Sequence, residues 1–221
     1  MRFSDKSLVN IAPAPVSRSV VLPELLVPCE PGFRDQGSQH FPTLMAIHAR
    51  RNIRDVQLFE EFSSAIGQSR ERVWIIDKHL FDDDGEYPDH EQRCLRVAGW
   101  FEYTQELKSV QILTSAHASK QNYITNKFQE LQEVVLEVRG SHSVPIDIKV
   151  RFSISSFPYI HDRFAIVDNE LWHFGATVGG FHRDVNAASR GWNVENHKAL
   201  EFFNLAWTGN SDLAHKQGVK K

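Results

Sequence analysis

Short apolar segments alternate with amphipathic ones through the middle of this chain, and the alternation limits the folds that it can adopt. Residues 73–76, 110–115 and 146–152 are rich in β-branched and apolar residues, which is typical of strands. Residues 91–107 and 123–138, which lie between them, repeat apolar positions at helical spacing. Strands separated by helices predict a mixed, largely parallel sheet flanked by helices. We therefore expect an α/β fold.

Further elements are predicted on either side of this region. Residues 53–66 carry apolar positions at helical spacing before Gly67, and this predicts an amphipathic helix. Two apolar segments, 164–167 and 171–174, are close enough in sequence to predict a tight hairpin. A glycine-containing loop follows Gly175. The last predicted helix covers residues 195–206 and precedes a polar tail.

The first part of the chain differs from the rest in its proline content. Residues 1–45 contain scattered prolines and predict an irregular N-terminal arm with one or two short strands, one of them at a sheet edge near Pro23. Residues 46–221 are then expected to form a single domain. The arm either covers this domain or reaches a protein partner.

Composition and charge exclude several classes of protein. A formal net charge of -3 and a pI near 6.4 argue against a surface that binds phosphates everywhere, although a local basic cleft is still compatible. No run of 18 apolar residues is present, so we expect no membrane segment and a cytoplasmic location. Cys29 and Cys94 lack metal-ligand spacing and suit a reducing compartment. We expect neither a metal nor a cofactor.

Three residues around the predicted strand 164–167 form the pattern most typical of catalysis. His161 and Arg163 are two residues apart and should project to the same face of the strand, whereas Asp168 follows its far end. An imidazole can attack a phosphorus atom, and a guanidinium can hold the phosphate oxygens by paired hydrogen bonds. Asp168 is expected either to orient a histidine or to anchor the turn. The alternative is that these residues lie at the solvent-exposed start of a strand and fit the pattern by chance.

The spacing His161-x-Arg163-x4-Asp168 matches H-x-K/R-x4-D, the signature of the phospholipase D superfamily, with Arg163 in the usual lysine place. The order of predicted elements between about residues 50 and 206 also resembles that superfamily. The resemblance implies a phospholipase D-like fold and a phosphodiesterase that needs no metal. In such enzymes one histidine forms a phosphohistidine and a second protonates the leaving group. Because this chain has one motif, the resemblance implies a homodimer that pairs two copies of His161.

This chain departs from the well-characterised hydrolases after the motif. Those enzymes continue into Gly-Ser-x-Asn, whereas this chain has Gly175-Ala176-Thr177-Val178, in which Ala176 and Val178 supply neither a hydroxyl nor an amide. The planar fork of Arg163 also differs from an ammonium point charge. The chain resembles a variant His-Asp-Arg group of the superfamily. The departures leave open that the motif has lost catalysis.

Several other residues are candidates for contact with substrate or for structural roles. Thr177 could partly replace the missing serine, and Arg183 and Arg190 fall in the glycine-containing loop near the strand ends, where open α/β sheets bind ligands. Asp77, at the end of the strand 73–76, is expected mainly as a turn cap. The other histidines, among them His79 and His117, lack metal-ligand spacing.

Two functions therefore follow from the sequence. The first is a metal-independent phosphodiesterase, a nuclease more than a lipase because no apolar interfacial helix is visible. It would act on nucleic acid as a dimer. The second is a catalytically silent module that uses the same fold to bind nucleic acid or a protein partner in a larger assembly. The resemblance also suggests bacterial defence or mobile-element systems. Nothing in the sequence distinguishes DNA from RNA.

Overall fold

The computed structural model describes residues 22–27, 40–53, 56–82, 90–140 and 144–209. In chain order, the elements are β1 (Glu24–Leu26), α1 (Leu44–Arg51), α2 (Glu60–Gln68), β2 (Arg72–Ile76), α3 (His90–Gly99), β3 (Ser109–Leu113), α4 (Ala118–Arg139), β4 (Asp147–Arg151), the 3-10 turn η1 (Ile154–Ser156), β5 (Arg163–Val167), β6 (Glu170–Phe174), the 3-10 turn η2 (Val178–Gly180), β7 (Ala188–Asn193) and α5 (Ala199–Thr208).

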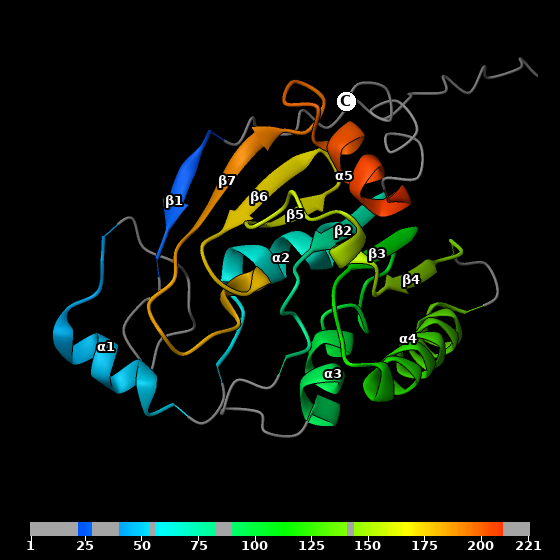
Figure 1. The fold of residues 1–221 in the computed structure, drawn as a ribbon, viewed down its shortest axis with the longest axis horizontal. Coiled ribbons are helices and arrows are strands. Elements are labelled where there is room, and N and C mark those ends of the chain that lie inside the picture. The colour runs from blue at the N-terminus through cyan, green and yellow to red at the C-terminus, as the bar shows by residue number, and fades with distance from the viewer. Residues whose placement is uncertain (1–21, 28–39, 54–55, 83–89, 141–143, 210–221) are drawn as a thin grey trace, which may run out of the picture.

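The strands form one mixed sheet in the order β1-β7-β6-β5-β2-β3-β4 (Figure 1). β2, β3 and β4 are parallel, as the alternation of strands and helices predicts. β5 pairs antiparallel with β2, and the antiparallel pattern continues through β6, β7 and β1. The predicted hairpin of β5 and β6 is confirmed, because a two-residue connection permits an antiparallel pair only. The α/β class with a mixed sheet is confirmed, but the sheet is mostly antiparallel and not largely parallel, because only the β2–β3 and β3–β4 pairs are parallel.

Helices cover both faces of this sheet (Figure 1). Because side chains alternate along a strand, Val73 and Ile75 of β2 join the core cluster that contains residues of α2, α3 and α4. Ile76 points the other way and joins Phe203 of α5 in a second cluster. β2 is therefore packed on both faces, which agrees with its apolar run.

The helix predicted for residues 53–66 is wrong in its first half. α2 begins at Glu60, and residues 56–59 are not helical, while residues 54–55 lie outside the described part of the chain. The backbone N–H of Phe59 donates to the carbonyl of Gly179 at 2.9 Å, and Val56 and Phe59 are buried. Their apolar spacing thus reflects packing against η2 rather than a helical face, a case in which tertiary contacts override local periodicity.

Two elements are absent from the sequence prediction. β7 lies where a loop was expected, and its sequence contains no β-branched residue, so pairing with β6 and β1 determines its conformation. α1 begins after Thr43, whose side chain accepts a hydrogen bond from the Ala46 N–H at 3.3 Å. Within the predicted arm, β1 is the expected short strand at a sheet edge. Residues 1–21 and 28–39 lie outside the described residues.

The remaining helices differ from the prediction in their ends. α3 is shorter than the predicted 91–107 because the chain turns at Trp100 and Phe101, whereas α4 begins before residue 123. α5 starts later than residue 195, since residues 195–198 form turns. Among the described residues, no helix is both long and apolar enough to cross a membrane.

Candidate functional site

The first two residues of the motif, His161 and Arg163, lie at the end of the sheet where the parallel strands finish. β5 runs antiparallel to β2, so its first residue lies beside the carboxyl end of β2. The register pairs Ile76 with Phe164, and one step further along the two chains come Asp77 and Arg163. Open α/β sheets bind ligands at this edge. The fold therefore places the first half of the motif where a site is expected.

Arg163 is held by groups on two neighbouring segments. Its Nε lies 3.4 Å from Oδ1 of Asp77, and its Nη1 donates to the carbonyl of Gly175 at 3.3 Å. The side chain is 24% exposed. Nη2 makes no hydrogen bond or ion pair within the described residues. The guanidinium is thus oriented by the protein on one side and can offer a donor to an anion on the other.

Asp77 is the buried carboxylate of this site. It is 0% exposed, accepts from the His79 N–H at 2.8 Å through Oδ1 and accepts from the Val178 N–H at 2.9 Å through Oδ2. Burial raises its pKa, while the two backbone donors and the nearby Arg163 and Arg93 charges act in the opposite direction. Asp77 does cap the turn as predicted, but it also connects the end of β2 to η2 and to β5.

His161 is exposed just before β5 and makes no hydrogen bond or ion pair with any described residue. Its neighbour Asp162 lies with Oδ2 3.6 Å from Nε2 of His173. An imidazole that is accessible and not engaged by other side chains is available to attack a substrate. The strand order therefore brings His161 and Arg163 to one edge, two residues apart along the chain.

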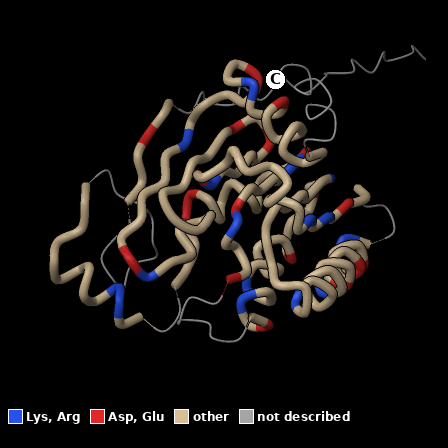
Figure 2. Tube along the Cα trace, viewed as in Figure 1, with Lys and Arg blue, Asp and Glu red and all other residues tan. Residues whose placement is uncertain are grey.

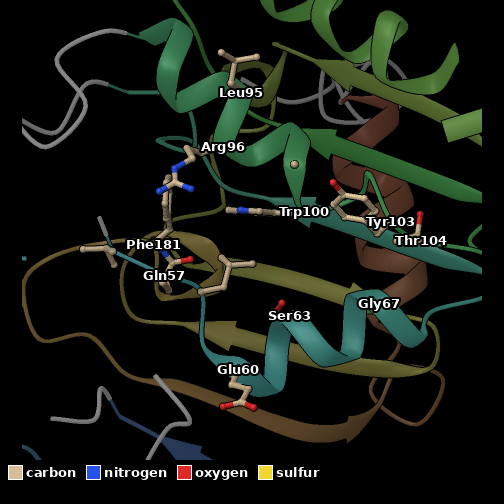
Figure 3. Close-up of a pocket in the computed structure, with 13 residues that line it drawn as sticks. Gln57, Glu60, Ser63, Gly67, Leu95, Arg96, Trp100, Tyr103, Thr104 and Phe181 are labelled. Atoms are coloured by element: carbon tan, nitrogen blue, oxygen red, sulfur yellow. The ribbon is translucent and has the colours of Figure 1, made fainter. Parts of the chain in front are cut away.

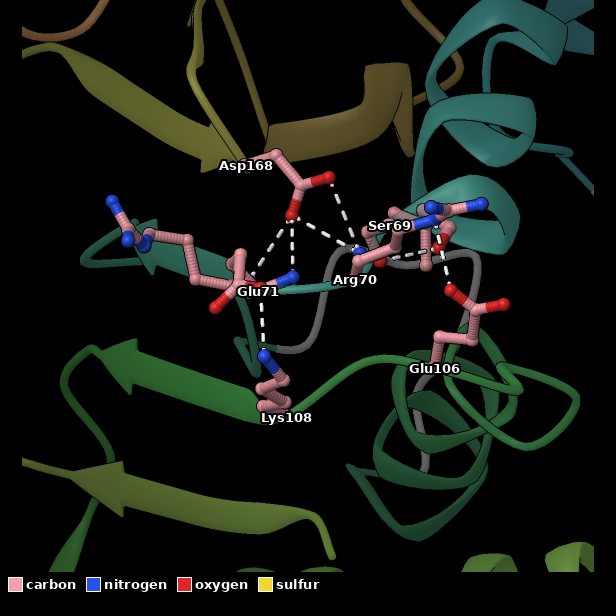
Figure 4. Close-up of polar contacts among 8 residues, drawn as sticks. Ser69, Arg70, Glu71, Glu106, Lys108 and Asp168 are labelled. Atoms are coloured by element: carbon pink, nitrogen blue, oxygen red, sulfur yellow. Dashed lines mark hydrogen bonds and ion pairs between the residues drawn. The ribbon is translucent and has the colours of Figure 1, made fainter. Parts of the chain in front are cut away.

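Asp168, the third residue of the motif, lies at the other end of β5. It lies five residue steps along the strand from Arg163, a distance of about 17 Å. Its carboxylate accepts hydrogen bonds from the backbone N–H groups of Arg70, Glu71 and Arg72 at 2.7–3.2 Å (Figure 4). Asp168 thus anchors the start of β2 and does not contact His161, so the turn-anchoring alternative agrees with the geometry.

The segment after β6 contributes through its backbone instead of the serine and asparagine side chains of the hydrolases. The Gly175 carbonyl accepts from Arg163, and the Val178 N–H donates to Asp77. Thr177, between them, is buried, and its carbonyl accepts from the Gly180 N–H at 3.1 Å. Thr177 is therefore adjacent to the site, whereas Ala176 and Val178 supply no polar side-chain atom.

The two predicted arginines lie in different places. Arg183 is half-buried in the loop after η2, beside the carbonyls of Gly180 and His182 that the buried Arg50 binds at 3.2 Å and 3.0 Å. Arg190 lies on β7 and is engaged elsewhere: Glu170 pairs with it at 2.7 Å, and the guanidinium carbon lies 4.5 Å from the Trp172 ring centroid. The structure does not bring Arg190 to the motif, because Glu170 and Trp172 lie toward the far end of the hairpin.

Sequence reasoning missed a second polar pair at the same edge. His79 follows Asp77 in the turn after β2, and its Nδ1 lies 2.6 Å from Oδ2 of Asp82. Both side chains are about half exposed, at 48% and 52%. The signal that was available is its position two residues after a polar strand end.

A separate groove of about 680 Å³ lies between α2 and α3 (Figure 3). Trp100 projects into it, and Leu95, Arg96 and Tyr103 line the α3 side. Phe181, three residues after Val178, lines one end. Neither His161 nor Arg163 lines this groove.

Charged residues of both signs are interspersed along the described chain (Figure 2). This agrees with the small net charge of -3. The described residues include no group of three or more His, Cys, Asp or Glu side chains arranged to hold a metal ion.

Comparison with known proteins finds only distant likeness. No family model matches the sequence, and no curated protein matches it. Among solved structures, the chain is similar to NucT from Helicobacter pylori, at 11% identity and a TM-score of 0.43 over 85% of this chain and 96% of that one. It is also similar to TrmBL2, described as an archaeal chromatin protein with a novel mode of DNA binding, at 9% identity and a TM-score of 0.36. That match covers 67% of this chain and 47% of TrmBL2, so it spans about half of TrmBL2. Likeness at this level transfers neither residues nor an activity.

Proposed function

We propose that this protein is a metal-independent phosphodiesterase of the phospholipase D-like type that acts on nucleic acid. The observation that supports it most is the exposed and unengaged His161 beside Arg163, whose guanidinium is held by a buried carboxylate. In this proposal His161 attacks phosphorus and Arg163 holds a phosphate oxygen. Thr177 and Arg183 are proposed to contact the substrate near the same edge.

The polymer substrate is proposed on two grounds. His161 is exposed and Arg163 is partly exposed, so a long chain can reach both side chains. A phosphodiester of nucleic acid also offers the non-bridging oxygens that a guanidinium binds. We further propose that the protein works as a homodimer, because the resemblance to the phospholipase D superfamily requires two histidines and each chain carries one motif.

The experiment compares the wild type with His161→Ala on labelled single- and double-stranded DNA and RNA in the presence of EDTA. His197→Ala is the matched control, since His197 is also exposed but lies in the turns before α5. Cleavage by the wild type and His197→Ala, with loss of at least about 100-fold in His161→Ala, supports the proposal. Determination of the mass in solution tests the dimer.

The second candidate is a catalytically silent module that binds nucleic acid or, through the N-terminal arm, a protein partner. The observation that favours it is the segment after β6, where Ala176 and Val178 offer no polar side chain and the Val178 N–H is already bonded to Asp77. This candidate predicts that a gel shift survives in His161→Ala and that every substrate stays intact. Either outcome decides between the two.

A further inference from the structure

A continuous group of aromatic side chains lies next to the motif, between β5, β6 and α5. Tyr159 packs on Phe157 with 5.2 Å between the ring centroids, and Phe157 packs on Phe202 of α5 at 5.9 Å. The ring of Phe202 lies 6.5 Å from that of Phe164 on β5, which in turn lies 5.3 Å from the His173 ring on β6. We call these five residues the aromatic surface.

Two rings of the aromatic surface are open to solvent. Tyr159 is 69% exposed and Phe202 is 41% exposed, whereas Phe157, which contacts both, is buried. Large apolar side chains that are exposed together, and not singly, mark interaction sites. The buried ring of Phe157 supports the two exposed rings, so the surface is ordered before a ligand arrives.

The aromatic surface meets the motif at two points. Tyr159 precedes His161 by two residues, so their Cα atoms are at most about 7 Å apart. Asp162, between His161 and Arg163, lies with Oδ2 3.6 Å from Nε2 of His173. A nucleic acid strand whose phosphate lies at His161 and Arg163 therefore carries a neighbouring base close to these rings.

The chemistry of the exposed rings suits a nucleobase that is not paired. Every base has a flat π-face, and stacking on aromatic side chains is how many proteins hold single strands. A base inside a duplex already stacks on its neighbours, and taking it out of the stack costs free energy. Tyr and Phe rings beside a phosphate site therefore favour single-stranded over double-stranded nucleic acid.

We propose that the aromatic surface binds an unpaired base next to the phosphate at His161 and Arg163, with Tyr159 and Phe202 as the stacking rings. The substrate class is then single-stranded nucleic acid. The inference rests on the part of the proposed function that names nucleic acid as the ligand. It is compatible with a homodimer, because each chain brings its own aromatic surface to its own motif.

The test measures binding in a His161→Ala background, so that the oligonucleotide stays intact. By fluorescence anisotropy in EDTA, Tyr159→Ala should raise the Kd for a labelled single-stranded DNA oligonucleotide by about tenfold. Tyr159→Phe should stay within about twofold because it keeps the ring, whereas Tyr159→Leu should resemble Tyr159→Ala. Tyr103→Ala is the matched control and should bind as the background does, since Tyr103 is 74% exposed but lines the separate groove.

Two other probes separate stacking from contact with phosphates. An abasic oligonucleotide keeps the phosphates and lacks the bases, so the background and Tyr159→Ala should bind it equally. A duplex of the same sequence should bind more weakly than the single strand and should be insensitive to Tyr159→Ala. Phe202→Leu, which keeps an apolar side chain on α5 without the ring, should weaken binding of the single strand alone.

Equal binding of the single strand by Tyr159→Ala and the background overturns the inference, while cleavage by the wild type would still support the proposed function. Equal loss of the single strand and the abasic oligonucleotide also overturns it, since stacking needs a base. A change of mass in solution in Tyr159→Ala overturns it as well, because the surface would then lie between two chains. If the stacking results hold but the wild type cleaves nothing, the inference stands and the phosphodiesterase proposal fails. If no nucleic acid binds, both fail.

Discussion

The carboxylate of Asp77 and the guanidinium of Arg163 face each other across β2 and β5, with 3.4 Å between Oδ1 and Nε. Asp77 is fully buried, whereas Arg163 retains partial exposure. The protein therefore holds Asp77 rigidly in its interior and leaves Arg163 accessible. A cation oriented in this way keeps its fork in one position when an anion approaches, which lowers the ordering cost of binding.

The first prediction concerns removal of the Asp77 carboxylate. Asp77→Ala should lower the free energy of unfolding by about 3–5 kcal/mol, because it leaves the His79 and Val178 N–H groups without their acceptor and the partly buried Arg163 without its ion-pair partner. Urea denaturation followed by circular dichroism measures this change. Asp162→Ala is the control, since that carboxylate is 62% exposed and should change stability little. Equal stability of both variants would contradict the role given to Asp77.

A second prediction follows from the raised pKa of Asp77. Burial makes the folded protein bind this proton more tightly than the unfolded chain does, so the group stabilises the fold most at low pH. Its contribution declines as the pH rises from the ordinary carboxyl pKa of 3.8 through the raised pKa of Asp77 in the folded protein. The stability of the wild type relative to Asp77→Asn, which does not titrate, should therefore fall over that range. Urea titrations of both proteins from pH 4 to pH 8 test the sign, and a rising difference would refute it.

The third prediction separates Asp168 from the chemistry. Asp168→Ala should lower the free energy of unfolding by about 2–3 kcal/mol, since three backbone N–H groups at the start of β2 lose their acceptor. The rate per folded molecule should stay near that of the wild type, because Asp168 lies about 17 Å along the strand from Arg163. Activity assays at a temperature where both proteins are folded check this. Loss of activity without loss of stability would show that Asp168 takes part in catalysis.

The parts of the fold that the sequence predicted are those with strong local patterns. The strands that became β2 and β3 are short apolar runs, and β4 alternates apolar and polar residues. The β5–β6 hairpin followed from the short spacing between two apolar segments. The sequence also predicted that His161 and Arg163 lie at the start of a strand, because both residues immediately precede or begin the apolar segment 164–167.

The parts that were missed depend on distant residues. β7 has no apolar alternation, and Gly191 within it has a φ of +101°, where an added Cβ would lie 2.5 Å from the Leu22 carbonyl oxygen. Its strand conformation comes from its neighbours, β6 and β1. The same reason applies to Asp77: its contacts with Arg163 and Val178 join residues about 90–100 positions apart, which no local pattern could reveal.

A fourth prediction tests the turn that carries the Val178 N–H. Gly180 has a φ of +72°, and a Cβ there would lie 2.5 Å from the Phe59 ring. Gly180→Ala should therefore destabilise the protein by more than about 1 kcal/mol, through backbone strain and displacement of a buried ring. Gly67→Ala is the control, because Gly67 lies in α2 with nothing within 4 Å of an added Cβ. This control should stabilise slightly. Equal thermal melting of the two variants would contradict the geometry at η2.

The fifth prediction concerns Cys94, a free and buried cysteine of α3. Burial raises the pKa of its thiol to about 12, so at pH 8 only about one molecule in ten thousand carries the reactive thiolate. In a Cys29→Ser background, the folded protein should therefore react with a thiol reagent far more slowly than the protein unfolded in guanidinium. Ala118→Cys in the same background is the control, since residue 118 is exposed at the start of α4. Fast labelling of Cys94 in the folded protein, at a rate like that of the control, would show that α3 opens readily from the sheet.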